Sequence, residues 1–429
     1  MNTPSRPKPR HWPAPIRALK HKNFQIYFAG QAVSTLGKWV QQVALAWLAY
    51  HLTSSPLLLG AITFLTLVPQ LLIGPLAGAW TDRHDKRRLL IIVQSMLAVQ
   101  SLCLAILTWG NWINSESIIA MALLLGLLNA FETPLRQALI GSFVTDPSDL
   151  PNALVLNAML INAARFVGPP LAGLLIAWSG EAGCFLLTAF AFAMLLIGLL
   201  KVRGTPTPRA QGSTREIFQE GLRYLWTTLT IRRLLLSVIM VNLLASCYTV
   251  LLPILARDVF AGNAQTLGWL WGAAGAGAFA ATLFLAFTSP LRKPRRIIDT
   301  GALLCALALC IMGLSAPLWL ALLTLALLGF GITVSNVSSN MLLQTQAPEK
   351  LRGRIVAFYI AMRFGFEAIG GLLAGTVAAV IGAQWTLAFA GIALLLYCFI
   401  NWQLETRLEN TPASDHPIPF PLTSHLHSN

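Results

Sequence analysis

The amino-acid sequence predicts an all-α membrane protein with twelve transmembrane helices in two pseudo-symmetric six-helix halves. Of its 429 residues, 56% are hydrophobic and 11% are charged, whereas about a quarter of the residues of a soluble protein are charged. A span needs about 20 apolar residues, so with loops the chain has room for about a dozen spans. This composition excludes a soluble enzyme. It also disfavours a nucleic-acid partner, because the chain cannot build a polar basic surface despite a net charge of +14.

The predicted spans are apolar stretches separated by two alternating kinds of loop, one short and neutral, the other longer and basic. The loops of the first half include, in chain order, HLTSSP, TDRHDKRR, NWINSES and SGEAG. Those of the second half include PLRKPRR, SAP, APEKLRGR and GAQ. The twelve predicted helices cover 24–50, 56–80, 88–109, 117–141, 152–178, 183–202, 232–257, 265–289, 296–315, 317–342, 354–381 and 384–404.

The basic residues set the predicted orientation. Of the 30 Lys and Arg residues, 25 fall in the two tails and the longer loops, all on one side of the predicted membrane. The positive-inside rule places that side, with both termini, in the cytoplasm. The N-terminal sequence has no short apolar region and no small-residue cleavage site, so we interpret it as a tail and not a signal peptide. The predicted location is the bacterial cytoplasmic (inner) membrane.

A weak internal repeat supports the two halves. Residues 165–180 align with 367–382 at a constant offset of 202, and Arg87-Arg88 align with Arg295-Arg296 at an offset of 208. Parallel six-helix repeats build one large group of secondary transporters. The predicted organisation is an N-terminal cytoplasmic tail at 1–23, a first half at 24–202, a cytoplasmic central loop at 203–231, a second half at 232–404 and a C-terminal cytoplasmic tail at 405–429.

The loop after the second span, GAWTDRHDKRR, resembles the signature loop of the major facilitator superfamily, G-x-x-x-D-[RK]-x-G-[RK]-[RK]. An acidic residue there can pair with basic residues or with a neighbouring helix N-terminus, which suits the latch of a cytoplasmic gate. The alternative is a positive-inside loop with an incidental acidic residue. Asp85 departs from the motif, which has Gly at that place. The matching residues are Gly78, Asp82, Arg83, Lys86 and Arg87.

Further stretches extend the resemblance. The run Gly168-Pro169-Pro170-Leu171-Ala172-Gly173 is similar to the G-P-x-x-G segment of antiporters and exporters of that superfamily. The similarity implies a hinge at Gly168, Pro169, Pro170 and Gly173, and ordinary small-residue packing is the alternative. Over most of the membrane region the chain resembles the drug and siderophore exporters related to the bacterial enterobactin exporter. The matching stretches are 23–60, 81–90, 132–139, 150–173 and 342–359.

Six ionisable residues within the predicted spans are the candidate site residues: Lys38, Glu132, Arg136, Arg165, Arg363 and Glu367. Charges at mid-bilayer cost about 2.5–3.5 kcal/mol each, so they usually face a cavity or a partner. One interpretation is internal pairing, because Glu132 and Arg136 are four residues apart, as are Arg363 and Glu367. The other is substrate binding or proton coupling, with the excess of cations favouring an anionic or acceptor-rich substrate.

The resemblance divides these six residues into two groups. It implies that Lys38, Glu132 and Arg136 line the central cavity and that Arg165, Arg363 and Glu367 lie at the interface between the halves. Glu132 is the first candidate for the proton carrier. Lys38 departs from the small polar residue expected at its position, and a cation there could change substrate selectivity.

These features predict a secondary active transporter, a proton-coupled exporter of a small amphipathic or anionic molecule by alternating access. The resemblance implies a siderophore or a drug-like compound as cargo. The alternatives are an importer or facilitator of the same fold, and a non-transporting membrane protein that handles lipids or transmits a signal. The sequence has no G-x-x-x-x-G-K-[ST] loop and no metal-binding helix motif, so we expect no enzymatic activity, cofactor or metal. The expected partners of a monomeric protein are the cargo, protons and the bilayer.

Overall fold

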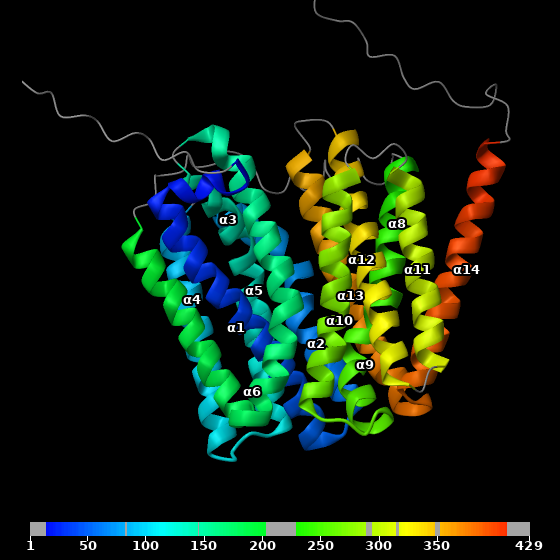
Figure 1. Cartoon of the computed structure of the whole chain (residues 1–429), viewed down its shortest axis with the longest axis horizontal. Coiled ribbons are helices and arrows are strands. Elements are labelled where there is room, and N and C mark those ends of the chain that lie inside the picture. The colour runs from blue at the N-terminus through cyan, green and yellow to red at the C-terminus, as the bar shows by residue number, and fades with distance from the viewer. Residues whose placement is uncertain are drawn as a thin grey trace, which may run out of the picture.

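The computed structural model describes residues 14–81, 84–144, 146–202, 229–288, 294–314, 317–347 and 352–409. Most of the predicted central loop and most of both predicted tails lie outside these ranges. The described chain is helical, with no strand among the residues listed above. Figure 1 shows a bundle in which the beginning of the described chain (blue) and its end (red) lie at the same end. We call this the terminal end and the opposite one the far end.

The first part of the chain forms a group of helices on one side of Figure 1. Its elements are η1 (Ala14–Lys20), α1 (Lys22–Thr53), α2 (Pro56–Leu72), α3 (Gly74–Thr81), α4 (Lys86–Trp109), α5 (Ser115–Phe143), η2 (Pro147–Asp149) and α6 (Leu150–Lys201). α6 comprises two helices, the fifth and sixth predicted spans, and between them the backbone turns at Gly180 with φ of +69°. Glycine tolerates that conformation without a steric penalty.

The second part forms the group of helices on the other side. Its elements are α8 (Leu229–Leu244), η3 (Ala245–Cys247), α9 (Tyr248–Ile254), η4 (Leu255–Val259), α10 (Ala264–Thr288), α11 (Pro294–Leu314), α12 (Leu318–Gln346), α13 (Arg352–Ile381) and α14 (Ala383–Glu409). Four of these, from α8 to the π-helical η4, together form the seventh predicted span.

Two predicted spans are interrupted where proline removes a backbone donor. The second span breaks at Ile73 between α2 and α3, two residues before Pro75. The seventh span passes through a 3-10 turn and a π-turn around α9, which contains Pro253. Proline cannot donate the i→i−4 hydrogen bond, so the helix re-forms with another pitch.

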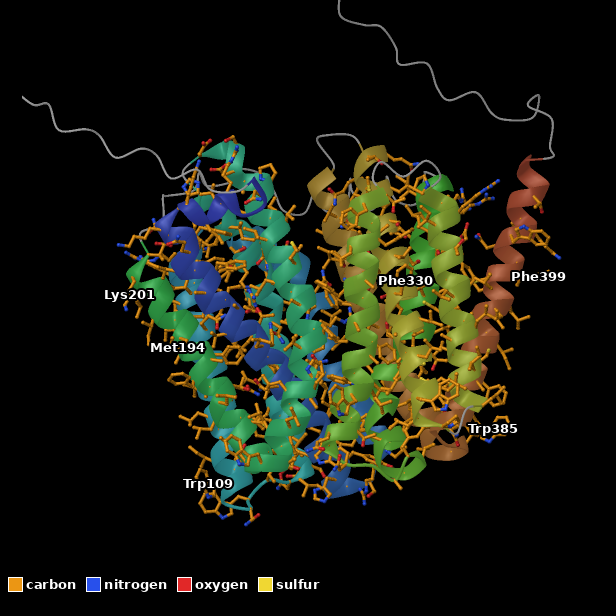
Figure 2. All side chains as sticks on the ribbon, viewed as in Figure 1. Trp109, Met194, Lys201, Phe330, Trp385 and Phe399 are labelled. Carbon is orange, nitrogen blue, oxygen red and sulfur yellow. The ribbon has the colours of Figure 1, made fainter. Side chains whose placement is uncertain are left out.

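The helices have the length and surface of membrane spans. Nine of them, among the described residues, are long and apolar enough to cross a bilayer, and the 52-residue α6 holds two spans. Large apolar side chains point outward around the bundle in Figure 2, including Trp109, Trp385 and Phe399, which are 74%, 58% and 53% exposed. With α1 and the shorter α2, the elements account for a twelve-span membrane protein.

The two halves meet through helices that the repeat relates to each other. α2 packs against α13, and α6 packs against α10. A Cβ at Gly60 would lie 2.9 Å from the carbonyl oxygen of Gly371, and a Cβ at Gly268 would lie 2.6 Å from that of Pro169. Small residues thus let the backbones approach closely. The repeat relates the second span (α2) to the eighth (α10) and the fifth (in α6) to the eleventh (α13). The contact of α2 with α13 and the contact of α6 with α10 are therefore symmetry-related.

Three apolar cores show where the halves are joined. The largest contains residues of both halves, such as Leu48 of α1, Leu251 of α9 and Leu387 of α14. A second lies within the first half and a third within the second half, both toward the terminal end. The described halves therefore share one core toward the far end and have separate cores at the terminal end.

Candidate functional site

The first cluster of predicted site residues lies inside the first half. Lys38 Nζ of α1 donates to Glu132 Oε2 of α5 at 2.5 Å, and an Arg136 guanidinium nitrogen donates to Glu132 Oε1 at 2.6 Å. Gln94 Nε2 of α4 donates to the same Oε1 at 3.1 Å, and Arg136 also donates to Thr35 Oγ1 at 3.0 Å. Both oxygens of the 1%-exposed Glu132 are therefore occupied. We call Lys38, Glu132 and Arg136 the ion triad.

The sequence positions these groups through helix geometry. Glu132 and Arg136 are four residues apart on α5, so they share one face and pair as the spacing predicts. Lys38 reaches the carboxylate from α1, a contact that sequence spacing cannot reveal. The ion triad carries one net positive charge, and the Lys38 side chain is 28% exposed whereas that of Arg136 is 12% exposed. Lys38 is therefore the most accessible member.

Further polar side chains surround the ion triad. Gln41 Nε2 donates to Gln100 Oε1 at 2.8 Å, both residues being buried. The Oε1 of Gln31 and the Oδ1 of Asn129 are buried without a hydrogen-bond partner in the described part of the chain. Buried polar groups of this kind usually have a partner. Unused acceptors therefore lie on the same helices, α1 and α5, as the residues of the ion triad.

Arg165 lies at the interface between the halves. Its guanidinium sits 5.9 Å from the centre of the Trp39 ring, and it donates to the Tyr248 hydroxyl at 3.3 Å. Trp39 in turn meets Trp271 edge-to-face at 6.2 Å. Since Arg165 and Trp39 belong to the first half and Tyr248 and Trp271 to the second, these four residues form an aromatic and cationic bridge beside Lys38.

Arg363 and Glu367 lie one turn apart on α13 but do not pair as their spacing allows. Within the described ranges they form no ion pair of 4.0 Å or less. The Arg363 guanidinium instead lies 5.0 Å from the centre of the Phe364 ring, and its Nε is buried without a hydrogen-bond partner there. Glu367 experiences the charges of both Arg363 and Arg165. The cation–π contact therefore replaces the predicted helix-face pair.

The predicted gate motif is described only in part. Asp82 and Arg83 lie outside the described residues, whereas Gly78 lies in α3 and Lys86 begins α4. Arg87 donates to the carbonyl oxygens of Leu199 at 2.9 Å and Leu200 at 3.0 Å. These carbonyls lie at the end of α6, so Arg87 ties two helices of the same half together.

Asp85, which departs from the motif, has a local role that we did not predict. Its side chain accepts hydrogen bonds from the backbone N–H groups of Arg87 at 3.0 Å and Arg88 at 3.1 Å. Asp85 is thus the N-cap of α4. An Asp just before the start of a predicted helix, here separated from Leu89 only by Lys86, Arg87 and Arg88, is the sequence signal that predicts this cap.

The predicted hinge residues line the packed interface of α6. A Cβ at Gly168 would lie 2.6 Å from the Cβ of Trp39, and a Cβ at Gly173 would lie 2.6 Å from the carbonyl oxygen of Ala264. The helix continues through Pro169 and Pro170. These positions therefore permit close approach of α6 to both α1 and α10, as the small-residue alternative predicted.

Two polar clusters near the ends of the bundle were missed by the sequence analysis. At the far end the Tyr50 hydroxyl donates to Asp258, and Arg257 donates to the Tyr50 carbonyl oxygen at 3.2 Å and to Ser54 Oγ at 3.0 Å. Tyr50 and Ser54 belong to the first half, and Arg257 and Asp258 to the second. We call this set the far-end latch, since it joins the two halves.

At the terminal end, the buried Asp149 receives three basic side chains from the chain's beginning. Lys20 Nζ lies 2.6 Å and His21 Nε2 lies 2.9 Å from its Oδ2, and Arg17 also donates to it. The contact with Lys20 is the first cause that holds the pKa of Asp149 below its ordinary value, followed by those with His21 and Arg17. Asp149 therefore anchors η1 to the loop between α5 and α6.

Comparison with known proteins supports a transport fold. The chain is 27% identical to the staphyloferrin A transporter of Staphylococcus aureus, over 91% of this chain and 99% of that protein. It is 27% identical to the multidrug efflux pump Tap of Mycobacterium tuberculosis, over 87% and 91%, and 25% identical to the enterobactin exporter EntS of Shigella boydii, over 90% and 92%. The solved nucleoside transporter NupG superposes with a TM-score of 0.73 at 12% identity, covering 90% of this chain and 99% of that one.

A family comparison covers nearly the whole sequence. The family described as "Transmembrane secretion effector" matches residues 13–426. The match includes the ion triad, the predicted gate and the predicted hinge. It also agrees with the helical bundle and with the signature loop after the second span. The chain therefore belongs to the transmembrane secretion effector family of the major facilitator superfamily of membrane transporters.

Proposed function

We propose that the protein is a proton-coupled exporter of a small anionic or amphipathic molecule. The observation that carries this proposal is the ion triad, in which one buried carboxylate is shared by two cations. Relatives named as a siderophore transporter, an enterobactin exporter and a multidrug efflux pump support the direction and the kind of cargo. A siderophore or a drug-like compound is the proposed cargo class.

In this proposal, cargo and proton compete for the same groups. A hydrogen-bond donor or cationic group of the cargo that binds the Glu132 carboxylate displaces Lys38, whose ammonium can then hold an anionic group of the same cargo. Arg136 on the same helix face stabilises the carboxylate while it is ionised. A proton that binds Glu132 removes its negative charge and releases the cargo. Because Glu132 holds either the cargo or a proton, proton flow in one direction drives cargo in the other.

The proposed cycle is a rocking of two halves, residues 24–202 and 232–404. We place the terminal end and both termini in the cytoplasm of a bacterial inner membrane, because the basic loops lie there. The shared core and the far-end latch then correspond to closure on the outer side. Arg165, Arg363 and Glu367 are proposed to respond to the movement, with the Gly168–Gly173 segment as hinge and the Asp82 loop as inner latch.

The test is transport in proteoliposomes with an imposed pH gradient. Staphyloferrin A, enterobactin and a panel of drug-like compounds would be the cargoes, with internal pH recorded in parallel. We expect Glu132→Gln to abolish proton movement coupled to cargo. Glu116→Gln, an exposed residue in the first turn of the same helix, is the matched control and should transport normally. Unchanged coupled transport by Glu132→Gln would refute the proposed proton carrier.

A further inference from the structure

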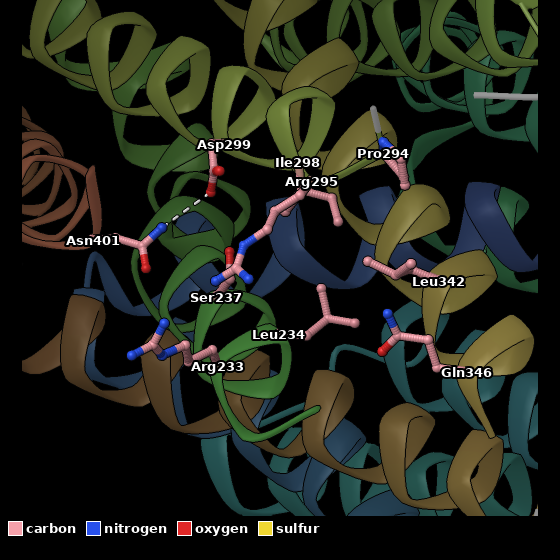
Figure 3. A pocket seen from close by; sticks show the side chains of 10 residues that line it. All are labelled: Arg233, Leu234, Ser237, Pro294, Arg295, Ile298, Asp299, Leu342, Gln346 and Asn401. Atoms are coloured by element: carbon pink, nitrogen blue, oxygen red, sulfur yellow. Dashed lines mark hydrogen bonds between the residues drawn. The ribbon is translucent and has the colours of Figure 1, made fainter. Parts of the chain in front are cut away.

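A cavity of about 240 Å³ lies at the terminal end of the second half, away from the ion triad. Figure 3 shows that it is bounded by the beginnings of α8 and α11 and by side chains from α12 and α14. A water molecule occupies about 30 Å³ in the liquid, so the cavity can hold a phosphate-sized group. It belongs to neither the proposed cargo site nor the interface between the halves.

The lining of the cavity is mostly apolar but includes charged side chains with one net positive charge. Arg233 and Arg295 contribute guanidinium groups, and Asp299 contributes a carboxylate that accepts a hydrogen bond from Asn401 Nδ2 at 3.2 Å. Figure 3 shows Arg295 extending toward Ser237. Guanidinium groups present paired donors that match the oxygens of a phosphate.

Ser237 is a second, independent indication of a ligand. It is 4% exposed and lines the cavity, and its hydroxyl lies beside that of Tyr397. Neither hydroxyl completes a hydrogen bond of normal geometry within the described part of the chain. A buried hydroxyl without a partner is uncommon in native structures. An oxygen-rich ligand in the cavity would satisfy it.

At the corresponding place in the first half, the described side chains are arranged differently. The repeat aligns Arg87 with Arg295, and Arg87 donates to the carbonyl oxygens at the end of α6. The nearby interior is filled by Phe24, Tyr27 and Phe143, each at most 1% exposed. Large aromatic side chains are thus buried at one of the two related places, and two arginines line a cavity at the other, so this lining is a property of the second half's sequence.

The cavity is also placed where a lipid can reach it. On α11 the helix face of Asp299 continues four and eight residues further with Leu303 and Leu307, which are 42% and 45% exposed. Basic pockets between spans at the cytoplasmic side bind anionic headgroups in other membrane proteins. An acyl chain lying along these leucines would bring its phosphate to the cavity.

We propose that this cavity binds the phosphate group of an anionic ligand, held by Arg233 and Arg295 with the Ser237 hydroxyl as a further donor. A phospholipid headgroup and free inorganic phosphate both carry such a group, so the test has one binding experiment for each. The proposal does not depend on the transported cargo.

The test measures binding to the purified full-length protein. In the first arm, native mass spectrometry counts bound phosphatidylglycerol and phosphatidylcholine; in the second, calorimetry follows inorganic phosphate. We expect Arg233→Gln and Arg295→Gln each to weaken binding about fivefold, the effect of one cation near an anionic headgroup. Arg232→Gln is the matched control, because Arg232 is exposed and does not line the cavity.

A cavity-filling variant separates binding from folding. Ser237→Leu keeps every charge but occupies the space, so it should also weaken binding while the thermal unfolding midpoint shows that the protein is folded. If one arginine variant fails to fold, the other arginine variant and Ser237→Leu decide. Weakening in these variants with an unchanged control supports the site, and the responding arm identifies the source. Binding that none of the three variants alters, or no binding in either arm, would overturn the proposal.

Discussion

The two halves tie their corresponding helices together by different chemistry. In the first half, α1 and α5 are joined by the ion triad of Lys38, Glu132 and Arg136. In the second half, α8 and α12 are joined by Asn242 and Asn336, whose side-chain amides exchange hydrogen bonds of 2.9 and 3.2 Å. One fold thus accepts either a charged or a neutral connection at related places. At these related places the first half therefore holds ionisable groups, and the second half holds a neutral pair that cannot take up or release a proton.

The largest expected effect comes from breaking the ion triad. Glu132→Gln leaves Arg136 and the partly exposed Lys38 without their counterion, and removing one partner of a buried ion pair costs about 3–5 kcal/mol. The thermal unfolding midpoint in detergent should fall accordingly. Adding Lys38→Met restores the original net charge of the cluster, so the double variant should regain much of the lost stability. A double variant less stable than Glu132→Gln alone would contradict this electrostatic account.

A smaller effect is expected from the neutral pair. Asn242→Ala removes both amide hydrogen bonds, and interhelical hydrogen bonds in membranes contribute about 0.6–2 kcal/mol. We expect a modest fall in the unfolding midpoint and an unchanged pH dependence of transport in proteoliposomes. If Asn242→Ala shifted that pH dependence as Glu132→Gln should, the assignment of the Asn242–Asn336 pair as a purely structural connection would be wrong.

The far-end latch should have a still smaller effect on stability but a visible effect on conformation. Asp258 is half-exposed, and exposed charged contacts contribute about 1 kcal/mol or less. Asp258→Asn should therefore leave the unfolding midpoint nearly unchanged. Hydrogen exchange of the backbone at 50–56 and 257–263 should accelerate, because the halves separate more often there. Glu181→Gln, also at the far end, is the control, and equal acceleration in both variants would argue against a latch.

The most local effect is expected at the terminal end, where Asp149 anchors η1. A carboxylate with a lowered pKa stabilises the folded state fully above its ordinary value of 3.8, and the contribution is lost as the pH falls through the lowered pKa. Proteolysis after Arg17 and Lys20 should therefore stay slow at pH 5 to 8. Asp149→Asn should be cleaved faster across that range, whereas Asp146→Asn, at an exposed neighbour, should be cleaved at close to the wild-type rate.

Much of the fold follows from the sequence because apolar length and loop charge are local signals. The helix bounds agree with the twelve predicted spans to within a few residues, apart from the breaks near Pro75 and Pro253. The two prolines are visible in the sequence, but the helical pitch that the chain adopts around each of them depends on packing against neighbouring helices. The N-cap at Asp85 is also a local signal, because Asp is one of the preferred residues at the start of a helix.

The candidate site was only partly predictable, because its key contacts join distant residues. The pairing of Glu132 with Arg136 followed from their spacing, whereas Lys38 reaches Glu132 across 94 residues of sequence. The same spacing failed for Arg363 and Glu367, because the guanidinium faces Phe364 instead. Spacing fixes which side chains share a helix face, but neighbouring helices decide which contact forms.

The glycine contacts between the halves also have a mechanical consequence. At Gly60 against Gly371, and at Gly268 against Pro169, backbone meets backbone with no side chain between them. Such a contact has no interdigitating side chains, so one half can rotate against the other without a change of side-chain rotamer at these points. The contact does not depend on which molecule lies between the halves. Residues around the ion triad can therefore diverge to suit new molecules while the contact itself stays the same.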